Sequence, residues 1–294
     1  MMGSHRSGEF VILGTILLCV FIDSDSLFAA NFESGTAAYE RGDYATALRE
    51  FRVLAVQGYS SSQNNLGVMY YEGLGVLQDD TEAMKWFRLA AGQGDASAQL
   101  NLGFMYAKGR GVPKDDTEAM KWFRLAAGQG YAKAQYNLGF MYGKGRGVPQ
   151  DYTEAHKWYR LAAGQGYAKA QLGLGFMYNE GQGVPQDDTE AVKWYRLAAG
   201  QGNAKAQYNL GLMYKRGRGV PRDYAEAHKW FNLAASRGHK EAVKNRGIVS
   251  RLMSRDQIAE AQRLAREWKP KPWSVLKKTL DRRYRPGKGK LFVF

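Results

Sequence analysis

Cysteine is nearly absent from this 294-residue chain, and its single copy, Cys19, lies in an apolar stretch near the N-terminus. Removal of that stretch leaves no thiol, which excludes disulfides, thiolate catalysis and cysteine-ligated zinc from the rest of the protein. Histidine is also scarce, with four residues. The chain therefore lacks the residues from which most thiol and metal sites are built, and we expect neither a cofactor nor a metal.

Long hydrophobic runs are lacking as well. The apolar stretch 10–22 has 13 residues, whereas a comfortable membrane span needs about 20. Arg6 precedes this stretch and the small residues Ala29 and Ala30 follow it, an arrangement typical of a secretory signal peptide. We therefore expect residues 1–30 to be a signal that is cleaved near Ala30, and the protein to be periplasmic or secreted. The alternative is an uncleaved N-terminus that anchors the protein to a membrane.

Acidic residues are outnumbered by basic ones, 28 to 42, which gives a formal net charge of +14 at pH 7. The final 27 residues, 268–294, contain nine lysines and arginines and one aspartate, and so carry +8 of this charge. We predict that residues 269–294 form a disordered basic tail. Its charge suits contact with an anionic membrane or an acidic glycan, and we expect no specific nucleic-acid partner.

The chain contains a clear internal repeat. Five tryptophans stand 36 residues apart, each within nearly the same sequence: Trp86, Trp122, Trp158, Trp194 and Trp230. A fixed period of this length indicates a stack of one supersecondary unit, because each unit buries its apolar face only against its neighbours. The 35 glycines fit this pattern, since they recur at fixed positions between the expected helices.

Each unit is predicted to form two helices. In the first, apolar residues such as Ala134, Leu138 and Met141 are three or four positions apart, which is helical spacing. A glycine within this helix leaves room for its partner to approach closely. A Gly-x-Gly-Val-Pro segment, residues 145–149 in this unit, then breaks the helix. The second helix begins at an Asp-x-x-Glu sequence that resembles a capping box, as at Asp151, and its tryptophan is predicted to pack between helices.

Three motifs, A-x-A-Q-x-N-L-G-x-M-Y, G-x-G-V-P and E-A-x-K-W, recur in most units between residues 59 and 238. They resemble the Sel-one-like repeat family, a branch of the tetratricopeptide superfamily with longer loops. The resemblance implies an all-α fold, a right-handed α-solenoid of antiparallel helix pairs with five 36-residue repeats over 59–238. Residues 31–58 resemble an ordinary tetratricopeptide-like unit, and residues 239–268 are expected to form a partial repeat and a C-terminal capping helix.

The resemblance also implies a scaffold or adaptor for protein–protein interaction, with the first helices lining a concave groove. Asparagine amides can bond the main chain of a peptide, aromatic side chains offer contact area, and lysines favour acidic groups. The expected partner is therefore a protein or peptide with acidic residues, and no oligomeric state is predicted. The alternative is that the asparagines join adjacent first helices and the phenylalanines belong to the core. The predicted groove residues are Asn101, Phe104, Lys133, Tyr136, Asn137, Phe140, Lys169, Phe176, Lys205, Tyr208 and Asn209.

No motif indicates catalysis. His156 and His228 occupy the same position in two units that are not adjacent, too far apart to share a metal. The glycine loops lack the strand–turn–helix context of a phosphate-binding loop. Ser274 and Lys277 have the S-x-x-K spacing of penicillin-binding enzymes, but the partner motifs are missing. We expect no enzyme. The alternative is an exported cell-wall or β-lactam hydrolase of the cysteine-rich type, whose paired cysteines this chain lacks.

Overall fold

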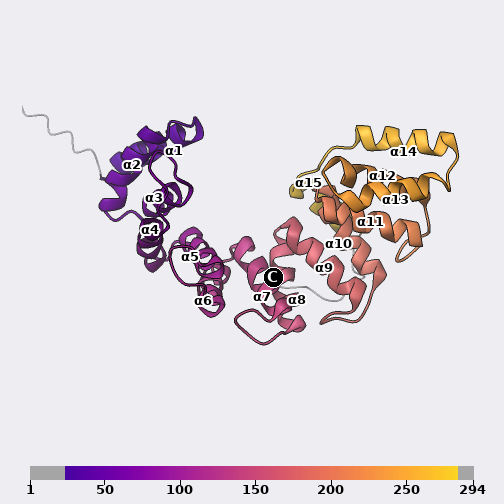
Figure 1. The fold of residues 1–294 in the computed structure, drawn as a ribbon, viewed down its shortest axis with the longest axis horizontal. Helices are drawn as coiled ribbons and strands as arrows, with labels where there is room; N and C mark the ends of the chain where they lie inside the picture. Colours follow the sequence, from indigo (N-terminus) through magenta and orange to yellow (C-terminus); the bar gives the residue numbers. More distant parts are fainter. Residues whose placement is uncertain (1–23, 284–294) are drawn as a thin grey trace, which may run out of the picture.

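A computed structural model describes residues 24–283 of the chain, and this described part consists of fifteen α-helices and their loops, without a β-strand. Consecutive helices pack in pairs, and the pairs follow one another along a curved path from α1 at one end to α14 at the other (Figure 1). The predicted all-α solenoid with 36-residue repeats is confirmed. None of the described helices is both long enough and apolar enough to cross a membrane.

The helices divide into an N-terminal pair, five repeat units and three C-terminal helices. The N-terminal pair is α1 (Ser24–Glu40) and α2 (Tyr44–Val56). Units 1 to 5 consist of a first and a second helix each: α3 (Ser60–Glu72) and α4 (Asp80–Gly92), α5 (Ala96–Lys108) and α6 (Asp116–Gly128), α7 (Ala132–Lys144) and α8 (Tyr152–Gly164), α9 (Ala168–Glu180) and α10 (Asp188–Gly200), α11 (Ala204–Arg216) and α12 (Tyr224–Ser236). The C-terminal helices are α13 (Lys240–Ser250), α14 (Arg255–Glu267) and α15 (Trp273–Arg283).

An aspartate caps the second helix of each unit, because its carboxylate accepts hydrogen bonds from N–H groups that have no partner inside the helix. In unit 2, Asp115 accepts from the N–H groups of Thr117 and Glu118, both at 2.9 Å. The Glu118 carboxylate pairs with Lys121 in the same helix instead of completing a capping box. The aspartate half of the predicted box is therefore present, and the glutamate belongs to an ion pair on the exposed face.

A glycine in the first helix brings the two helices of a unit close together, as predicted. In unit 3, a Cβ atom at Gly139 would lie 2.5 Å from Cδ1 of Tyr159, so the ring occupies the space that a side chain would need. The same helix ends at Gly145, whose φ of 63° lies in the left-handed region that glycine adopts without a steric penalty.

Buried glutamines join neighbouring units, a role that the sequence analysis did not identify. Gln99 donates from Nε2 to the Ala91 carbonyl at 3.3 Å, and Gln129 donates from Nε2 to Gln99 Oε1 at 2.8 Å. The same pair of bonds recurs at Gln63, Gln135 and Gln171. A buried polar group without a partner costs about 1–3 kcal/mol, so these bonds favour one arrangement of each unit on the next.

The recurring tryptophans lie where units pack together. Trp122 is partly buried against a cluster shared by units 1 and 2, and Trp158 against one shared by units 2 and 3. Trp230 is only 9% exposed and donates from Nε1 to Glu226 at 2.9 Å. These contacts agree with the prediction that the tryptophans are packing residues.

Helices α13 and α14 follow the last unit in the region expected to cap the array. Ser254 and Gln257 form a complete capping box at the start of α14. Trp268, directly after the last residue of this helix, lies edge-on to Trp230 with the ring centroids 6.3 Å apart. This contact joins the end of α14 to the second helix of unit 5.

The prediction of a disordered tail from residue 269 onward is wrong for the residues that the structure describes, because residues 273–283 form α15. The Lys271 N–H donates to the Gly200 carbonyl at 2.9 Å, and the Leu276 side chain lies against Gly200 with 9% of its surface exposed. Gly200, the last residue of α10, has no side chain and so leaves room for Leu276, which is the physical reason for an ordered helix here.

Two predicted segments fall partly or wholly outside the described residues. Residues 1–23, the larger part of the predicted signal, are not described, and residues 24–30 begin α1. Residues 284–294, with the apolar C-terminal end of the predicted tail, are not described either.

Candidate interaction site

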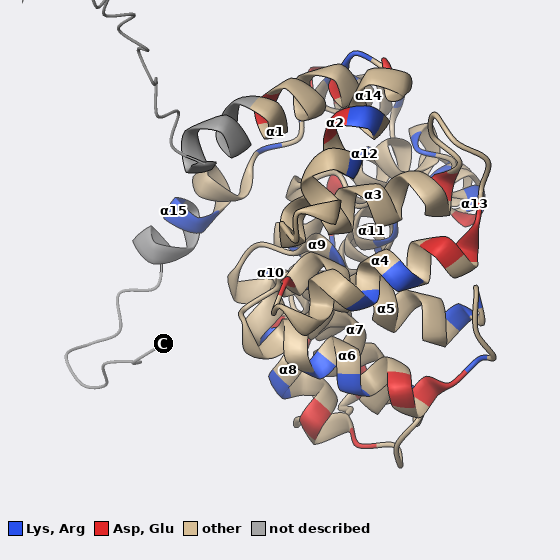
Figure 2. Cartoon of the chain, turned by 90° about the vertical axis from the view of Figure 1, so that its left-hand side faces the viewer, with Lys and Arg blue, Asp and Glu red and all other residues tan. Residues whose placement is uncertain are grey.

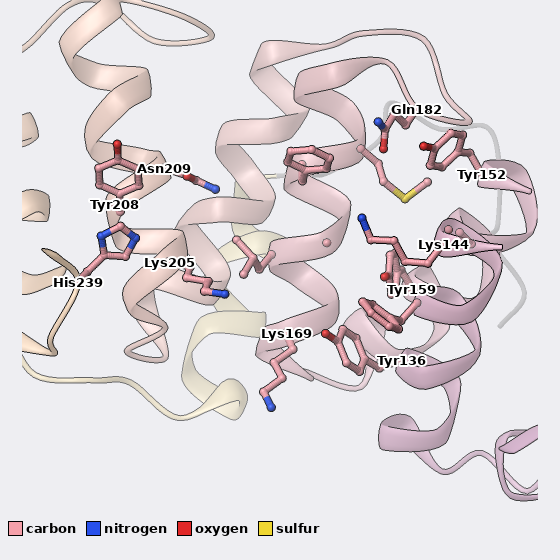
Figure 3. Close-up of a pocket in the computed structure, with 17 residues that line it drawn as sticks. Tyr136, Lys144, Tyr152, Tyr159, Lys169, Gln182, Lys205, Tyr208, Asn209 and His239 are labelled. Atoms are coloured by element: carbon pink, nitrogen blue, oxygen red, sulfur yellow. The ribbon is translucent and has the colours of Figure 1, made fainter. Parts of the chain in front are cut away.

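A pocket of about 470 Å³ opens among the first helices α7, α9 and α11 together with α8, and we call it the Tyr159 pocket (Figure 3). Its residues come from three consecutive units, and His239, just before α13, also contributes. Seven of the predicted groove residues line it: Tyr136, Phe140, Lys169, Phe176, Lys205, Tyr208 and Asn209. The repeat period thus places side chains from separate units around one space.

A second pocket of about 280 Å³ lies nearer the N-terminus, and we call it the Phe104 pocket. Three further predicted residues, Asn101, Phe104 and Lys133, line it. The Lys133 and Lys108 Nζ atoms lie 5.3 and 5.9 Å from the centre of the Phe104 ring, within the range of a cation–π interaction. Phe104 also lies edge-on to Phe123, at 5.3 Å between centroids, so its ring belongs partly to the core.

The predicted asparagines make hydrogen bonds inside the array. Asn137 lines neither pocket, and its amide donates to the Lys133 carbonyl in its own helix at 2.8 Å. The Asn101 amide donates across a unit boundary to Asn64 Oδ1 at 3.0 Å. The Asn101 bond matches the alternative in which the asparagines join adjacent first helices, whereas the Asn137 bond stays within one helix. Asn101 and Asn209 nevertheless line pockets.

Positive charge in the Tyr159 pocket has no acidic counterpart in its lining. Lys144, Lys169 and Lys205 line the pocket together with no aspartate or glutamate, and no ion pair between described residues involves any of the three. The second helices differ, since Lys121 pairs with Glu118 one turn away. Figure 2 shows acidic and basic residues interspersed on α4 and α6.

Two stacked ring pairs line the Tyr159 pocket. The Tyr136 and Tyr159 centroids are 5.6 Å apart at an interplanar angle of 27°, and those of Tyr208 and His239 are 4.3 Å apart at 19°. Burial raises the pKa of the Tyr159 hydroxyl above its ordinary value, and that of Tyr136 likewise. Both hydroxyls are therefore neutral at physiological pH, so the lysines dominate the electrostatics of the pocket.

Sequence reasoning missed several residues of this pocket. The aromatic position of Tyr159 recurs in every unit, whereas Lys144 has a lysine counterpart only at Lys108, and neither residue was among the predicted groove residues. Tyr152, Gly173 and Gln182 carry a different signal, because they replace the aspartate, asparagine and arginine that stand at the equivalent positions of most other units. Unit 5 also has a tyrosine, Tyr224, in place of the aspartate, and unit 1 has Leu74 in place of the arginine. The signal for these three residues is that they differ from the residues usual at their positions in the repeat.

The sequence candidates for catalysis and metal binding lie apart from the two pockets, except for His239. Ser274 and Lys277 are both exposed on α15. No group of three or more metal-ligating side chains occurs between residues 24 and 283. His228 is 2% exposed, and burial lowers its pKa below the ordinary value, with a smaller contribution from Arg246. It is a neutral core residue.

A family model settles the identity of the repeat. The Sel1 repeat model matches five consecutive segments, residues 60–95, 96–131, 132–167, 168–203 and 204–239. The chain belongs to the Sel1 repeat family. The family inferred from the sequence motifs is therefore confirmed. Sel1 repeat proteins are generally non-enzymatic scaffolds for protein–protein interaction.

Solved structures of other repeat proteins are similar to this Sel1 repeat chain. A Sel1 repeat protein from Oxalobacter formigenes is 32% identical with a TM-score of 0.70, over 89% of this chain and 99% of that one. A protective antigen of uropathogenic Escherichia coli strains with an SLR fold is 24% identical with a TM-score of 0.30, over 92% and 89%. An immunity protein from Pseudomonas aeruginosa is 19% identical with a TM-score of 0.46, over 71% and 81%. None of the curated proteins matches this chain.

Proposed function

We propose that this protein is an interaction scaffold whose first helices form a groove for an acidic segment of another protein. The observation that carries the proposal is the Tyr159 pocket, where aromatic walls and three lysines meet without an acidic residue in the lining. Elsewhere on the array, lysines of the second helices are paired with glutamates. Unpaired positive charge beside exposed aromatic surface favours a partner that brings both carboxylates and apolar groups.

The mechanism is the binding of a peptide segment across consecutive units. Each unit adds its own first-helix side chains, so the partner is recognised by residues that differ from one unit to the next. Toward the N-terminal units, Lys133 and Lys108 add positive charge at the Phe104 pocket, where Glu72 is the one acidic residue of the lining. Exposed lysines attract the acidic segment over roughly 8 Å at physiological ionic strength, so affinity falls as salt rises.

The function is tested with labelled peptides and the purified protein. One peptide contains glutamates and a central aromatic residue, and the second has lysines in place of the glutamates. The acidic peptide is expected to bind more tightly, with a Kd that increases with salt concentration in fluorescence anisotropy. Equal binding of the two peptides, or binding that does not respond to salt, contradicts the proposal.

We also propose that the protein is exported and cleaved near Ala30. The support is the sequence pattern of a basic start, the apolar stretch 10–22 and the small residues that follow it. Intact-mass analysis of the extracytoplasmic fraction is expected to show a chain that begins at Asn31. A full-length soluble protein found only in the cytoplasm contradicts this proposal.

A further inference from the structure

We infer that the Tyr159 pocket receives one aromatic side chain of the partner, flanked by acidic residues, and that Gly173 determines this specificity. The inference rests on the proposed function, because it concerns the same first-helix groove. It adds the kind of residue that anchors the partner and the place where that residue is inserted.

Tyr159 is more exposed than the aromatic residues at the equivalent position of the other four units. Each unit has an aromatic residue at this position of the second helix, and in the other four units it is buried: Phe87 is 1% exposed, Phe123 2%, Tyr195 2% and Phe231 0%. Tyr159 alone is only partly buried, and its ring lines the pocket. The repeat normally covers this ring, and in unit 3 it does not.

Gly173 explains the exposure of Tyr159. In the other units the first helix that follows carries an asparagine at this position, and Asn209 forms a hydrogen bond with the buried Tyr195. The equivalent residue over Tyr159 is Gly173, where an added Cβ would lie 3.1 Å from Cε2 of the ring. A side chain at position 173 would therefore stand directly on Tyr159, and its absence leaves one face of the ring uncovered.

The rim of the pocket differs from the rest of the array as well. Elsewhere the loop of one unit is joined to the second helix of the preceding unit by an arginine–aspartate pair, as between Arg218 and Asp188, with Nε to Oδ2 at 2.9 Å. Over the Tyr159 pocket the equivalent residues are Gln182 and Tyr152, and both line the pocket. These two substitutions replace an ion pair by uncharged side chains, so neither the arginine nor the aspartate is present at the rim, and Lys144 has no carboxylate there.

These departures from the repeat meet in one place. Gly173 uncovers an aromatic ring, and Tyr152 and Gln182 put a further phenol and an amide where other units have an aspartate–arginine pair. Lys144 lies on one side of Tyr159, and Lys169 and Lys205 project on the other (Figure 3). Aromatic rings favour stacked or edge-on contact with one another, and lysines favour carboxylates. The complementary occupant is an aromatic side chain with acidic neighbours on both sides.

The test uses three fluorescently labelled glutamate-rich peptides that differ only at a central tryptophan, leucine or alanine. With the wild-type protein, the tryptophan peptide is expected to bind about tenfold more tightly than the alanine peptide, through burial of the aromatic side chain. It is also expected to bind more tightly than the leucine peptide. Gly173→Asn restores the residue of the other units, and we expect it to abolish the tryptophan preference while the alanine peptide binds as before.

The outcomes separate this inference from the proposed function. If all three peptides bind the wild type equally and with salt dependence, the acidic groove stands and the aromatic anchor is wrong. If the leucine peptide binds as tightly as the tryptophan peptide, or if Gly173→Asn keeps the full preference, the assignment is also wrong. If no acidic peptide binds, the proposed function itself fails.

Gly173→Ser is a second variant that inserts a smaller group, and circular dichroism confirms that each variant folds. Should neither variant fold, the comparison of the three peptides on the wild-type protein still decides for or against an aromatic anchor. A matched control is Gly164→Asn, at a helical glycine where an added Cβ meets nothing within 4 Å. This control is expected to keep the tryptophan preference.

Discussion

Arg146 and Asp116 join two successive units through a paired contact, in which Arg146 Nε donates to Asp116 Oδ2 at 3.1 Å and Nη2 donates to Oδ1 at 2.5 Å. The arginine comes from the loop after α7, and the aspartate opens α6 of the preceding unit. Equivalent pairs join Arg110 with Asp80 and Arg218 with Asp188. The contact thus recurs along the array wherever both residues are present, and it is missing at the Tyr159 pocket.

The first prediction concerns this ion pair and pH. The hydrogen bond from Arg146 is the largest cause that lowers the pKa of Asp116 below its ordinary value. The stabilisation is therefore complete above the pKa of the unfolded chain, about 3.9, and is lost as pH falls through the lower folded pKa. Asp116→Asn is expected to lower the free energy of unfolding at pH 7 by up to about 1 kcal/mol, and the thermal midpoint with it, because the pair is partly solvated. The difference in thermal midpoint between the variant and wild type, measured by circular dichroism, should shrink below pH 4. A difference that stays constant with pH would argue against the ion pair.

The second prediction concerns His228, which is buried and whose Nδ1 has no hydrogen-bond partner among the described residues. Burial lowers its pKa in the folded protein, so at pH above about 6.5 the histidine is neutral whether the chain is folded or not. As pH falls below that value, the unfolded chain takes up a proton first and the folded state loses relative stability. His228→Met places there the residue found at positions 84 and 120. The melting temperature of this variant should fall less steeply than that of wild type between pH 7 and 5, and parallel curves would refute the assignment.

The third prediction is that Trp158→Ala destabilises several units at once. The Trp158 side chain packs against the cluster shared by units 2 and 3, and removal of a large aromatic side chain from such a site costs about 3 kcal/mol. Because the units are coupled through their neighbours, urea denaturation should show the loss spreading beyond unit 3. Leu161→Ala is the control, since Leu161 lies on the same helix and is 52% exposed. Similar effects of the two variants would show that Trp158 has no special packing role.

The fourth prediction separates the lysines of the pocket from those of the second helices. Lys169→Ala and Lys205→Ala should each weaken binding of a glutamate-rich peptide by about two- to fivefold at low salt. The effect should diminish as salt screens the charge. Lys157→Ala is the matched control, because Lys157 lies on α8 and pairs with Glu154 at 2.5 Å. Equal losses for all three variants would point to net charge and not to the groove.

For the predicted groove residues, the repeat pattern of one unit predicts the side of the helix on which a residue lies, but not the role of its side chain. Ten of the eleven predicted residues line one of the two pockets, because the side of a helix that a residue occupies follows from its position in the repeat. Asn137 does not, since its amide bonds the main chain of its own helix. The role of an amide depends on the donors and acceptors around it, which the position in the repeat does not specify.

The sequence by itself determined the repeating helix pairs, their aspartate caps and glycine ends, and the solenoid they form. Those features arise from contacts within one unit or between adjacent units, and each 36-residue segment contains them in full. The tertiary structure alone decided the Tyr159 pocket, because Gly173, Tyr152 and Gln182 have their effect only when three units are packed side by side. It also decided that residues 273–283 form a helix, since the Leu276 side chain packs against Gly200, the last residue of α10, which is far away along the chain. Such a contact depends on the completed shape of the array, so a periodic pattern does not predict it.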